Sequence, residues 1–339
     1  MSPHAHPTST AQAPAPAPAL SVLVVSYNSK PLIDALLQRL ARELSGLDAE
    51  LLLVDNASHD GTAAHVQQHH PWVRLIASDS NLGFAAANNL AARAARGRFL
   101  LLLNPDALPH PGTVARGLAL MQAHHEVGMA GARLLDEAGR TQPSARMFPS
   151  PLQELLVLSG LAVRYPRSRL CGHLDRSWAD PDQAAAVDWV PGAFALMPRA
   201  LFAALGGFDE RFFLYYEEVD LCQRVRAAGL QVMYWPELRV QHVGGASART
   251  VAGASLSRSG SQLTLWRARS GLLYYRKHHG WLVAWLVNRL ERGWHALRRR
   301  RAHLQGVAGK AQESAQQAAL LARAWNDTLG GRVAPPRPW

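Results

Sequence analysis

The chain has 339 residues, of which 48% are hydrophobic, and a formal net charge of +11 at pH 7. This length and composition can bury a substantial core, so we expect one large domain with an appendage. The two cysteines, Cys171 and Cys222, are too few for a disulfide framework and lack metal-ligand spacing, which favours a reducing, cytosolic setting.

The net positive charge comes from one end of the chain. Residues 1–257 carry 21 Lys and Arg against 22 Asp and Glu, whereas residues 258–339 carry 15 against 3. The first 19 residues alternate Ala and Pro after a polar start, with no Lys or Arg before an apolar run. They predict a disordered leader rather than a secretory signal, and no apolar run reaches the roughly 18 residues of a membrane-spanning helix.

Residues 20–77 alternate short apolar runs with amphipathic ones. These patterns predict strands at Leu20–Val25, Leu51–Val54 and Val73–Ala77, with a helix at Pro31–Leu44 and another before the third strand. This order predicts a mostly parallel α/β sheet flanked by helices, of nucleotide-binding type. The carboxyl ends of such strands carry the site, and polar clusters stand there at Ser26–Asn28 and Asp55–Ser58.

An Ala-rich helix with Asn88 and Asn89 comes next, and then a very hydrophobic strand, Phe99–Leu103, that ends in Asn104-Pro105-Asp106. An aspartate at the carboxyl edge of a sheet is well placed to bind Mg²⁺ together with substrate phosphates. The same tripeptide is equally typical of a turn with an Asx hydrogen bond.

The rest of the first 257 residues continues this pattern. We expect a helix at Pro111–His124, a helical turn at Leu201–Leu205, loops and short helices in the proline-containing region 140–185, and strands at Val127–Gly131, Val187–Val190, Ala193–Met197, Val232–Trp235 and Arg239–Val243.

An acidic stretch follows an aromatic run at residues 212–216. Apolar residues at helical spacing predict a helix from Glu217 that stops near Gly229. Glu217, Glu218 and Asp220 then lie in its first turn, where the helix dipole favours negative charge. An acidic helix start with no further role is the alternative.

Eight segments share one feature: each matches a motif of a known enzyme family, in the family's order. They are VVSYN (24–28), VDNASHDGT (54–62), NLGFAAANN (81–89), LLLNPDA (101–107), ARLLDEAGR (132–140), VDWVPGAFALMPR (187–199), GGFDERFFLYYEEVDLCQR (206–224) and QHVGGAS (241–247). Together they resemble the family 2 glycosyltransferases of the GT-A fold, especially bacterial rhamnosyltransferase-like members. The resemblance implies a GT-A domain at residues 20–257 that moves a sugar, with inversion, from a nucleotide diphosphate to a hydroxyl, aided by Mg²⁺ or Mn²⁺.

The resemblance also implies roles for individual residues. Ser26, Tyr27 and Asn28 would line the nucleotide pocket, Asp55 would bind the base, and Asn81 and Gly83 would approach the nucleotide sugar. Asp106 would hold the metal as the last residue of an Asp-X-Asp motif whose first position is here the neutral Asn104. His242 would contact the metal or the diphosphate, unless it is merely structural. Trp189, Gly192 and the aromatic residues 213–216 would face the sugars or, alternatively, pack in the core.

The chemistry of an inverting transfer fits these assignments. One carboxylate must take the proton of the acceptor hydroxyl, and positive charge must stabilise the departing diphosphate. The family motif favours Glu217 as the base, with Glu218 second because it replaces the usual Asp, and Asp220 as a supporting residue.

The donor is not encoded in any single residue; the subgroup resemblance favours dTDP-rhamnose over UDP- and GDP-sugars, and a glycan or lipid-linked saccharide as acceptor. Two other classes are a sugar-phosphate nucleotidyltransferase, whose basic Gly-rich loop is missing after the first strand, and a non-catalytic sugar-binding relative, which the retained Asp106 and Glu217 disfavour. Nucleic acid is not expected as a partner, because the aromatic residues of the basic tail lie on an apolar stripe.

The basic tail, residues 258–339, predicts helices at Gln262–Tyr275 and Gly280–Arg301, a weaker one at Gln305–Leu329 and a disordered end at Arg332–Trp339. In the second helix an apolar stripe is separated from arginines; the stripe is Val283, Leu286, Val287, Leu290, Trp294 and Leu297, and the arginines are Arg289, Arg292, Arg299 and Arg300. This pattern favours peripheral binding to the anionic inner face of the cytoplasmic membrane. Docking of the stripe on the catalytic domain is the alternative.

Overall fold

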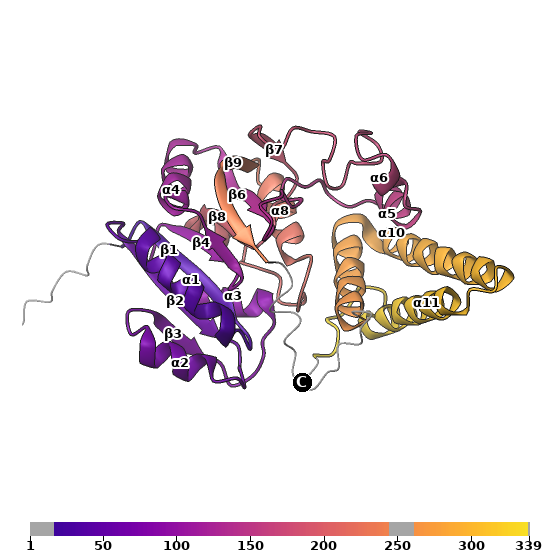
Figure 1. Cartoon of the computed structure of the whole chain (residues 1–339), viewed down its shortest axis with the longest axis horizontal. Helices are drawn as coiled ribbons and strands as arrows, with labels where there is room; N and C mark the ends of the chain where they lie inside the picture. Colours follow the sequence, from indigo (N-terminus) through magenta and orange to yellow (C-terminus); the bar gives the residue numbers. More distant parts are fainter. Residues whose placement is uncertain (1–16, 244–260, 338–339) are drawn as a thin grey trace, which may run out of the picture.

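A computed structural model describes residues 17–243 and 261–337 (Figure 1). Most of the predicted leader, residues 1–16, lies outside the described residues. So do Gly244, Gly245 and the predicted boundary near residue 257.

One mixed sheet of nine strands forms the centre of residues 17–243. Its order is β3 (Arg74–Ala77), β2 (Ala49–Asp55), β1 (Leu20–Ser26), β4 (Phe99–Leu103), β8 (Phe194–Pro198), β6 (Val127–Leu135), β9 (Gln231–His242) and β5 (Ala107–Pro109), and β7 (Ala185–Val187) also pairs with β9. Strands β8, β5 and β7 run against the other six, so the sheet is mostly parallel, as predicted. The chain moves outward from β1 to β3 and then returns to the other side of β1 as β4. Open α/β sheets bind ligands at such a reversal.

Helices cover both faces of the sheet. On one face α1 (Lys30–Glu43), α2 (Thr62–His69) and α4 (Thr113–Ala123) pack on one set of strand residues; on the other, α3 (Phe84–Ala94), α7 (Arg199–Ala204) and α8 (Glu217–Ala227) pack on the alternate set. In β1, for example, Val22 and Val24 face α1 while Leu23 and Val25 face α3. Because successive side chains point to opposite faces and both faces are covered, the strands read as continuous apolar runs.

Several strands differ from the prediction: β5 was not expected, and β6 continues past Gly131 to Leu135. The expected strands 232–235 and 239–243 are one strand, β9, interrupted by a register shift at which Ala132 faces Trp235 and Arg133 faces Arg239. The skipped residues include Pro236, which has no N–H to donate to a ladder. The strand expected at 187–190 is instead Ala185–Val187, because the amides of Asp188 and Trp189 donate to the carbonyl of Arg146.

The region 140–185 consists of loops and short helices, as expected, with α5 (Pro151–Leu158) and α6 (Leu161–Arg164). Helix α5 begins after Ser150, whose Oγ accepts a hydrogen bond from the amide of Gln153. It packs beside the tail, where the Tyr275 hydroxyl donates to Glu154 Oε1 at 3.0 Å.

The tail forms α10 (Ser261–Leu304) and α11 (Ala308–Thr328), which lie side by side next to the sheet domain (Figure 1). Helix α10 is interrupted at Gly280, whose φ of 83° is outside the helical range, and this divides it near the predicted boundary. Its first half packs on the sheet domain: Leu272 and Leu273 share an apolar cluster with Phe212 and Val219. The predicted stripe was only partly right, because Val287 is buried whereas Leu286 and Leu297 are exposed.

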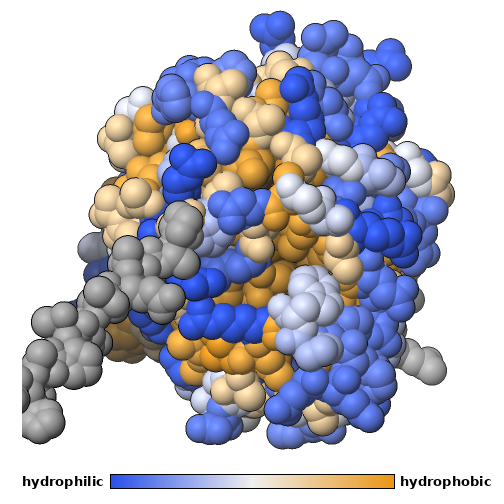
Figure 2. Space-filling model, turned by 90° about the vertical axis from the view of Figure 1, so that its left-hand side faces the viewer, coloured by the Kyte–Doolittle hydropathy of each residue, from blue (hydrophilic) through white to orange (hydrophobic). Residues whose placement is uncertain are grey.

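The face of the molecule that carries the first strands shows hydrophilic side chains around a hollow in which apolar residues are visible (Figure 2). Among the described helices, none has a stretch apolar and long enough to span a bilayer.

Candidate active site

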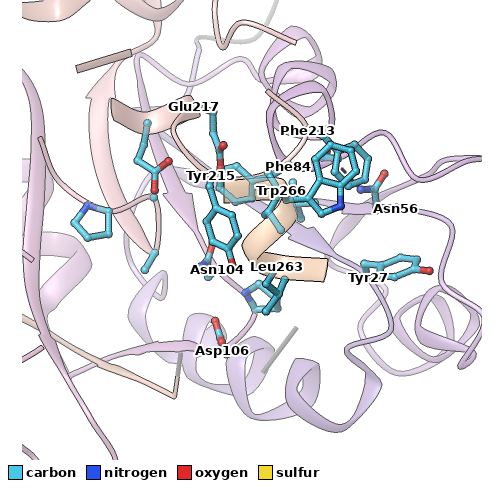
Figure 3. A pocket seen from close by; sticks show the side chains of 18 of the residues that line it. Tyr27, Asn56, Phe84, Asn104, Asp106, Phe213, Tyr215, Glu217, Leu263 and Trp266 are labelled. Carbon is cyan, nitrogen blue, oxygen red and sulfur yellow. Dashed lines mark hydrogen bonds between the residues drawn. The ribbon is translucent and has the colours of Figure 1, made fainter. Parts of the chain in front are cut away.

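A cavity of about 320 Å³ opens at the carboxyl ends of β1 and β4 (Figure 3). Eight of the residues predicted to bind the nucleotide or the metal or to act as the base line it: Tyr27, Asn81, Gly83, Asn104, Asp106, Glu217, Glu218 and His242. In Figure 3, Glu217 and Asp106 lie on opposite sides of Tyr215 and Asn104. The topology thus brings together two acidic groups that are more than one hundred residues apart in sequence.

The Asn81–Gly83 loop is fixed by amide hydrogen bonds. Asn81 Oδ1 accepts from Asn56 Nδ2 and from the Gly83 amide, both at 2.9 Å, and Asn56 Oδ1 accepts from the Leu82 amide. Gly83 has a φ of +81°, and a Cβ there would lie 2.5 Å from the Phe213 carbonyl oxygen. Only glycine fits this position, which joins the loop to the aromatic run.

Ser26, Asn28 and Asp55 do not line the cavity but lie next to it at the strand ends. Ser26 and Asp55 face each other in the β1–β2 ladder. Ser26 Oγ and Asp55 Oδ1 are buried without a hydrogen-bond partner among the described residues. Asn28 Oδ1 instead accepts from the His59 amide at 2.8 Å, which ties the first polar loop to the second. Unpaired buried polar atoms are uncommon and mark places where a ligand group can bind.

Asp106 and His242 meet because β5 pairs with β9. Ala107 stands opposite His242 in that ladder, and His242 Nε2 lies 3.6 Å from Asp106 Oδ1. His242 Nδ1 contacts Gln142 Oε1 at 2.9 Å, while Gln142 Nε2 donates to the His242 carbonyl. A proton on Nδ1 satisfies this contact and leaves the Nε2 lone pair facing Asp106.

The Asn-Pro-Asp tripeptide forms a turn through a main-chain hydrogen bond rather than the expected Asx hydrogen bond. The Asn104 carbonyl accepts from the Ala107 amide at 3.1 Å, and the residue also lines the cavity. The turn is what directs Asp106 into the cavity from the end of β4.

Glu217 and Glu218 open helix α8 after two residues with unusual backbone conformation. Tyr215 and Tyr216 have φ values of 70° and 67°, a region that bulky residues occupy only at a cost of about 1–3 kcal/mol each. Such strain persists only when the surroundings enforce it, and it is concentrated at functional sites.

The two glutamates differ in their electrostatic surroundings. Burial, followed by the charge of Glu218, raises the pKa of Glu217 well above its usual range. Burial also raises the pKa of Glu218, but the Gly192 amide donates to its carboxylate, and Arg146 and Arg267 oppose the rise. Glu218 is therefore the more easily ionised member of the pair.

The aromatic residues divide between cavity and core. Phe213 and Tyr215 line the cavity with Gly192, as predicted, whereas Phe212 is buried in the core and Trp189 lies under Arg146 with its indole N–H on the Met147 carbonyl. Tyr216 also lies outside this cavity, with its hydroxyl 3.4 Å from Glu154 Oε1.

The tail completes the cavity wall, which sequence reasoning missed. Leu263 and Trp266 of α10 line the cavity, and the Trp266 ring stacks on Phe213 at a centroid distance of 4.5 Å. The apolar spacing of 262–275 predicted a helix face but gave no signal of what that face covers. Asn56 and Phe84, also in the wall, belong to matched motifs but were not singled out.

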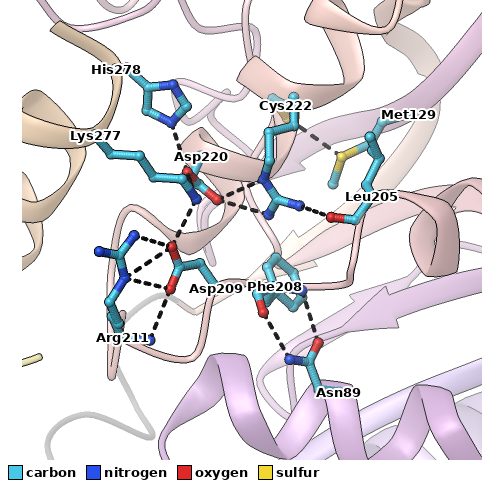
Figure 4. Close-up of polar contacts among 11 residues, drawn as sticks. Asn89, Met129, Leu205, Phe208, Asp209, Arg211, Asp220, Cys222, Lys277 and His278 are labelled. Carbon is cyan, nitrogen blue, oxygen red and sulfur yellow. Dashed lines mark hydrogen bonds and ion pairs between the residues drawn. The ribbon is translucent and has the colours of Figure 1, made fainter.

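The tail also holds helix α8 in place. Asp220 is fully buried and binds Arg224, Lys277 and His278, the last through Nε2 at 2.7 Å (Figure 4). Ser270 Oγ donates to the Leu214 carbonyl at 2.8 Å. Helix α10 therefore contacts the chain on both sides of the strained residues Tyr215 and Tyr216, at Leu214 and at Asp220.

Comparison with known proteins agrees with this geometry. The family model "Glycosyl transferase family 2" matches residues 21–170. The chain is 31% identical to an N-acetylglucosaminyl-diphospho-decaprenol L-rhamnosyltransferase of Mycobacterium tuberculosis over 66% of this chain and 75% of that protein. It is 25% identical to the rhamnosyltransferase WbbL of Escherichia coli over 65% of this chain and 82% of that protein.

In fold, the chain is similar to the mannosyltransferase PcManGT of Pyrobaculum calidifontis, solved with GDP-Man and Mn²⁺. The TM-score is 0.51 at 19% identity, over 96% of this chain and 91% of that one. With the motifs, the sheet and the relatives in agreement, the chain belongs to glycosyltransferase family 2 and is a glycosyltransferase of GT-A type.

Proposed function

We propose that the enzyme transfers a sugar, with rhamnose from dTDP-rhamnose as the first candidate, to a hydroxyl of a cell-surface glycan or lipid-linked saccharide, and that the anomeric configuration inverts. The observation that carries this proposal is the single cavity that has Asp106 and His242 on one wall and Glu217 and Glu218 on another. Two relatives named as rhamnosyltransferases, one of them acting on a diphospho-decaprenol acceptor, support the choice of donor and acceptor.

Asp106 and His242 fit a divalent cation. A carboxylate oxygen and an imidazole nitrogen face each other at 3.6 Å, and Gln142 fixes the ring so that Nε2 keeps its lone pair. When bound, Mg²⁺ or Mn²⁺ would supply positive charge to the departing diphosphate. PcManGT, which shares the fold, was solved with Mn²⁺. The neutral Asn104 in place of a first aspartate leaves one negative charge fewer at this wall.

The Glu217–Glu218 pair is our candidate for the base. Burial of two neighbouring carboxyls disfavours ionisation of both, and the charge of Glu218 further raises the pKa of Glu217. The family motif favours Glu217 as the base, whereas the Gly192 amide and the nearby arginines favour a negative charge on Glu218. Either carboxylate would accept the acceptor's hydroxyl proton as its oxygen attacks the anomeric carbon.

The nucleotide would lie along the ends of β1 and β2. Tyr27 and Asn81 line the cavity on that side. The buried Ser26 hydroxyl next to it offers a donor or an acceptor to the base and ribose, and the Asp55 carboxylate offers an acceptor. Leu263, Trp266 and Phe213 would cover the sugar with apolar surface and exclude water from the reacting atoms.

The tail offers a surface for an anionic membrane, which suits a lipid-linked acceptor. Trp281, Leu282, Trp285 and Leu286 are exposed on α10, and the Arg289 guanidinium lies over the Trp285 ring. Tryptophan and arginine on one helix face are typical of helices that lie in the membrane interface. Peripheral association with the inner face of the cytoplasmic membrane is therefore part of the proposal.

A donor panel tests the proposed function. The enzyme is mixed with dTDP-rhamnose, UDP-sugars or GDP-sugars, with Mn²⁺ and a polyprenyl-diphosphate saccharide, and the released nucleotide is identified. We expect acceptor-dependent release of dTDP. Release of inorganic diphosphate from a nucleoside triphosphate and a sugar phosphate would point to a nucleotidyltransferase, and no release with any donor would favour a non-catalytic relative.

A further inference from the structure

Three side chains with metal-binding atoms converge between α1 and α2, on the helices that cover the α1 face of the sheet. His65 Nε2 lies 2.8 Å and His70 Nε2 2.7 Å from the same oxygen, Asp34 Oδ1. One ligand atom from each residue lies within 4.8 Å of the other two. This cluster shares no residue with the Asp106–His242 wall, which is built from β5 and β9.

We propose that Asp34, His65 and His70 form a second metal site, for Zn²⁺ or a similar transition metal that prefers nitrogen ligands, and that the ion links α1 to α2. Two imidazoles and one carboxylate are a donor set that zinc takes in proteins, with a water in the fourth position. Mg²⁺ prefers oxygen ligands and would not be selected by two imidazoles.

Buried residues next to Asp34 and His65 fix the positions of these two proposed ligands on their helices. Ile33 anchors α1 in the core, which leaves the next residue, Asp34, at the helix edge with its side chain 45% exposed. Val66 anchors α2, with His65 beside it, and the His70 amide ends the helix by donating to the Val66 carbonyl at 2.8 Å. Both histidine side chains are mostly buried, and the exposed carboxylate leaves an entry for the ion and its water.

The two nitrogen–oxygen distances need only a small adjustment for a metal to bind. In a tetrahedral zinc site with bonds of roughly 2.0–2.1 Å, neighbouring ligand atoms lie about 3.3 Å apart. The N–O distances of 2.7 and 2.8 Å are those of hydrogen bonds, so binding would replace the shared protons and move the ligand atoms apart by about half an ångström. The hydrogen bonds from His70 and His65 hold the pKa of Asp34 below its usual value, so the carboxylate is already charged.

His69 provides a matched control within the same helix. Its ring stacks on that of His65 at a centroid distance of 4.4 Å, and its Nδ1 contacts the His65 carbonyl. It is a histidine next to the site that contributes no atom to the cluster.

The test measures zinc binding by the full-length, tag-free protein after chelation. An Asp106→Ala background weakens the catalytic site, and Zn²⁺ is then titrated by calorimetry and by competition with a chromophoric chelator. We expect one zinc equivalent, with affinity lowered at least about 100-fold by His65→Ala/His70→Ala and unchanged by His69→Ala, because two of the three ligands are removed. Asp34→Asn, which keeps the side-chain shape, should also weaken binding.

Thermal unfolding supplies a readout that does not depend on turnover. Zinc should raise the melting temperature of the Asp106→Ala protein and of its His69→Ala derivative but not of the His65→Ala/His70→Ala derivative. Equal zinc affinity in the two histidine derivatives, or equal loss in both, would overturn the assignment and point to binding elsewhere, such as the histidines of the N-terminal segment. The proposed transferase activity is unaffected by either result.

Discussion

Glu217 and Glu218 are adjacent in sequence and both line the cavity, yet their surroundings affect their pKa values differently. Burial raises the pKa of both, repulsion from Glu218 adds to the rise at Glu217, and only Glu218 receives the Gly192 amide. The motif identified this pair of glutamates. Which of the two is more easily ionised depends on Arg146 and Arg267, and no local sequence pattern indicates that these arginines lie near the pair.

Substitution of each glutamate by glutamine should show which of the two accepts the proton of the acceptor hydroxyl. Loss of the base lowers turnover at least ~10²-fold, the lower end of general-base contributions, while folding and nucleotide binding persist. Loss of the other glutamate, which is not the base, leaves turnover measurable. The fall in turnover at acid pH then begins at a lower pH, because removal of a neighbouring negative charge lowers the pKa of the remaining carboxyl. The measurement is kcat against pH for Glu217→Gln and Glu218→Gln; near-normal profiles in both would exclude the pair.

Gln142 is a positioning residue for the proposed metal-binding pair Asp106 and His242, since it contacts His242 through Nδ1 and through the main-chain carbonyl. Gln142→Leu should weaken Mn²⁺-dependent donor binding about 10–100-fold, the range for partners of metal ligands, whereas Asp106→Ala should abolish the metal dependence. Donor titration with and without Mn²⁺ measures both. If Gln142→Leu binds Mn²⁺ normally, the histidine does not depend on this hydrogen bond.

At the scale of elements, helix α8 owes its position to the tail. Its N-terminus follows two strained tyrosines, and its buried Asp220 is held by Lys277 and His278 of α10 (Figure 4). The sequence predicted α8 and its acidic first turn from periodicity alone. It could not predict that Lys277 and His278 bind Asp220, because the sequence pattern around them is the same as for a Lys-His pair exposed to solvent.

Asp220→Asn should lower the free energy of unfolding by about 1–3 kcal/mol, because it leaves Arg224 and Lys277, which are partly buried, without their counter-charge. Turnover should fall with it, since the helix that carries Glu217 loses its brace. The matched control is Glu237→Gln, which removes an exposed pair with Arg116 and should cost no more than about 1 kcal/mol. Chemical denaturation measures both, and a similar small loss in the two variants would mean that the tail does not hold α8.

At the scale of the whole molecule, the sequence predicted the α/β sheet, its carboxyl-edge site and the helical tail. Buried strands and caps are local, so periodicity finds them. Strand order, the β4–β8 antiparallel pairing and the docking of α10 depend on contacts between distant segments, and these were not predicted. The tail shows the consequence: its first half contributes Leu263 and Trp266 to the cavity, although the sequence predicted only a helix there.

The exposed apolar residues of α10 allow a direct test of the proposed membrane binding. Replacement of Trp281, Leu282, Trp285 and Leu286 by Ser or Gln should reduce flotation with anionic vesicles at least about tenfold without lowering the melting temperature, because these side chains are exposed. Replacement of Leu297 alone, exposed farther along the helix, is the control for a general loss of apolar surface. Unchanged flotation of the fourfold variant would rule this face out as the membrane contact.

The central claim is that one cavity holds a metal-binding wall and a proton-accepting wall for sugar transfer. It is tested most directly by the configuration of the product formed from dTDP-rhamnose and a polyprenyl-diphosphate saccharide, determined by NMR, for wild type and Glu217→Gln/Glu218→Gln. We predict a single product of inverted configuration from the wild type and none above background from the double variant. A product of retained configuration, or undiminished product from the double variant, would contradict the account.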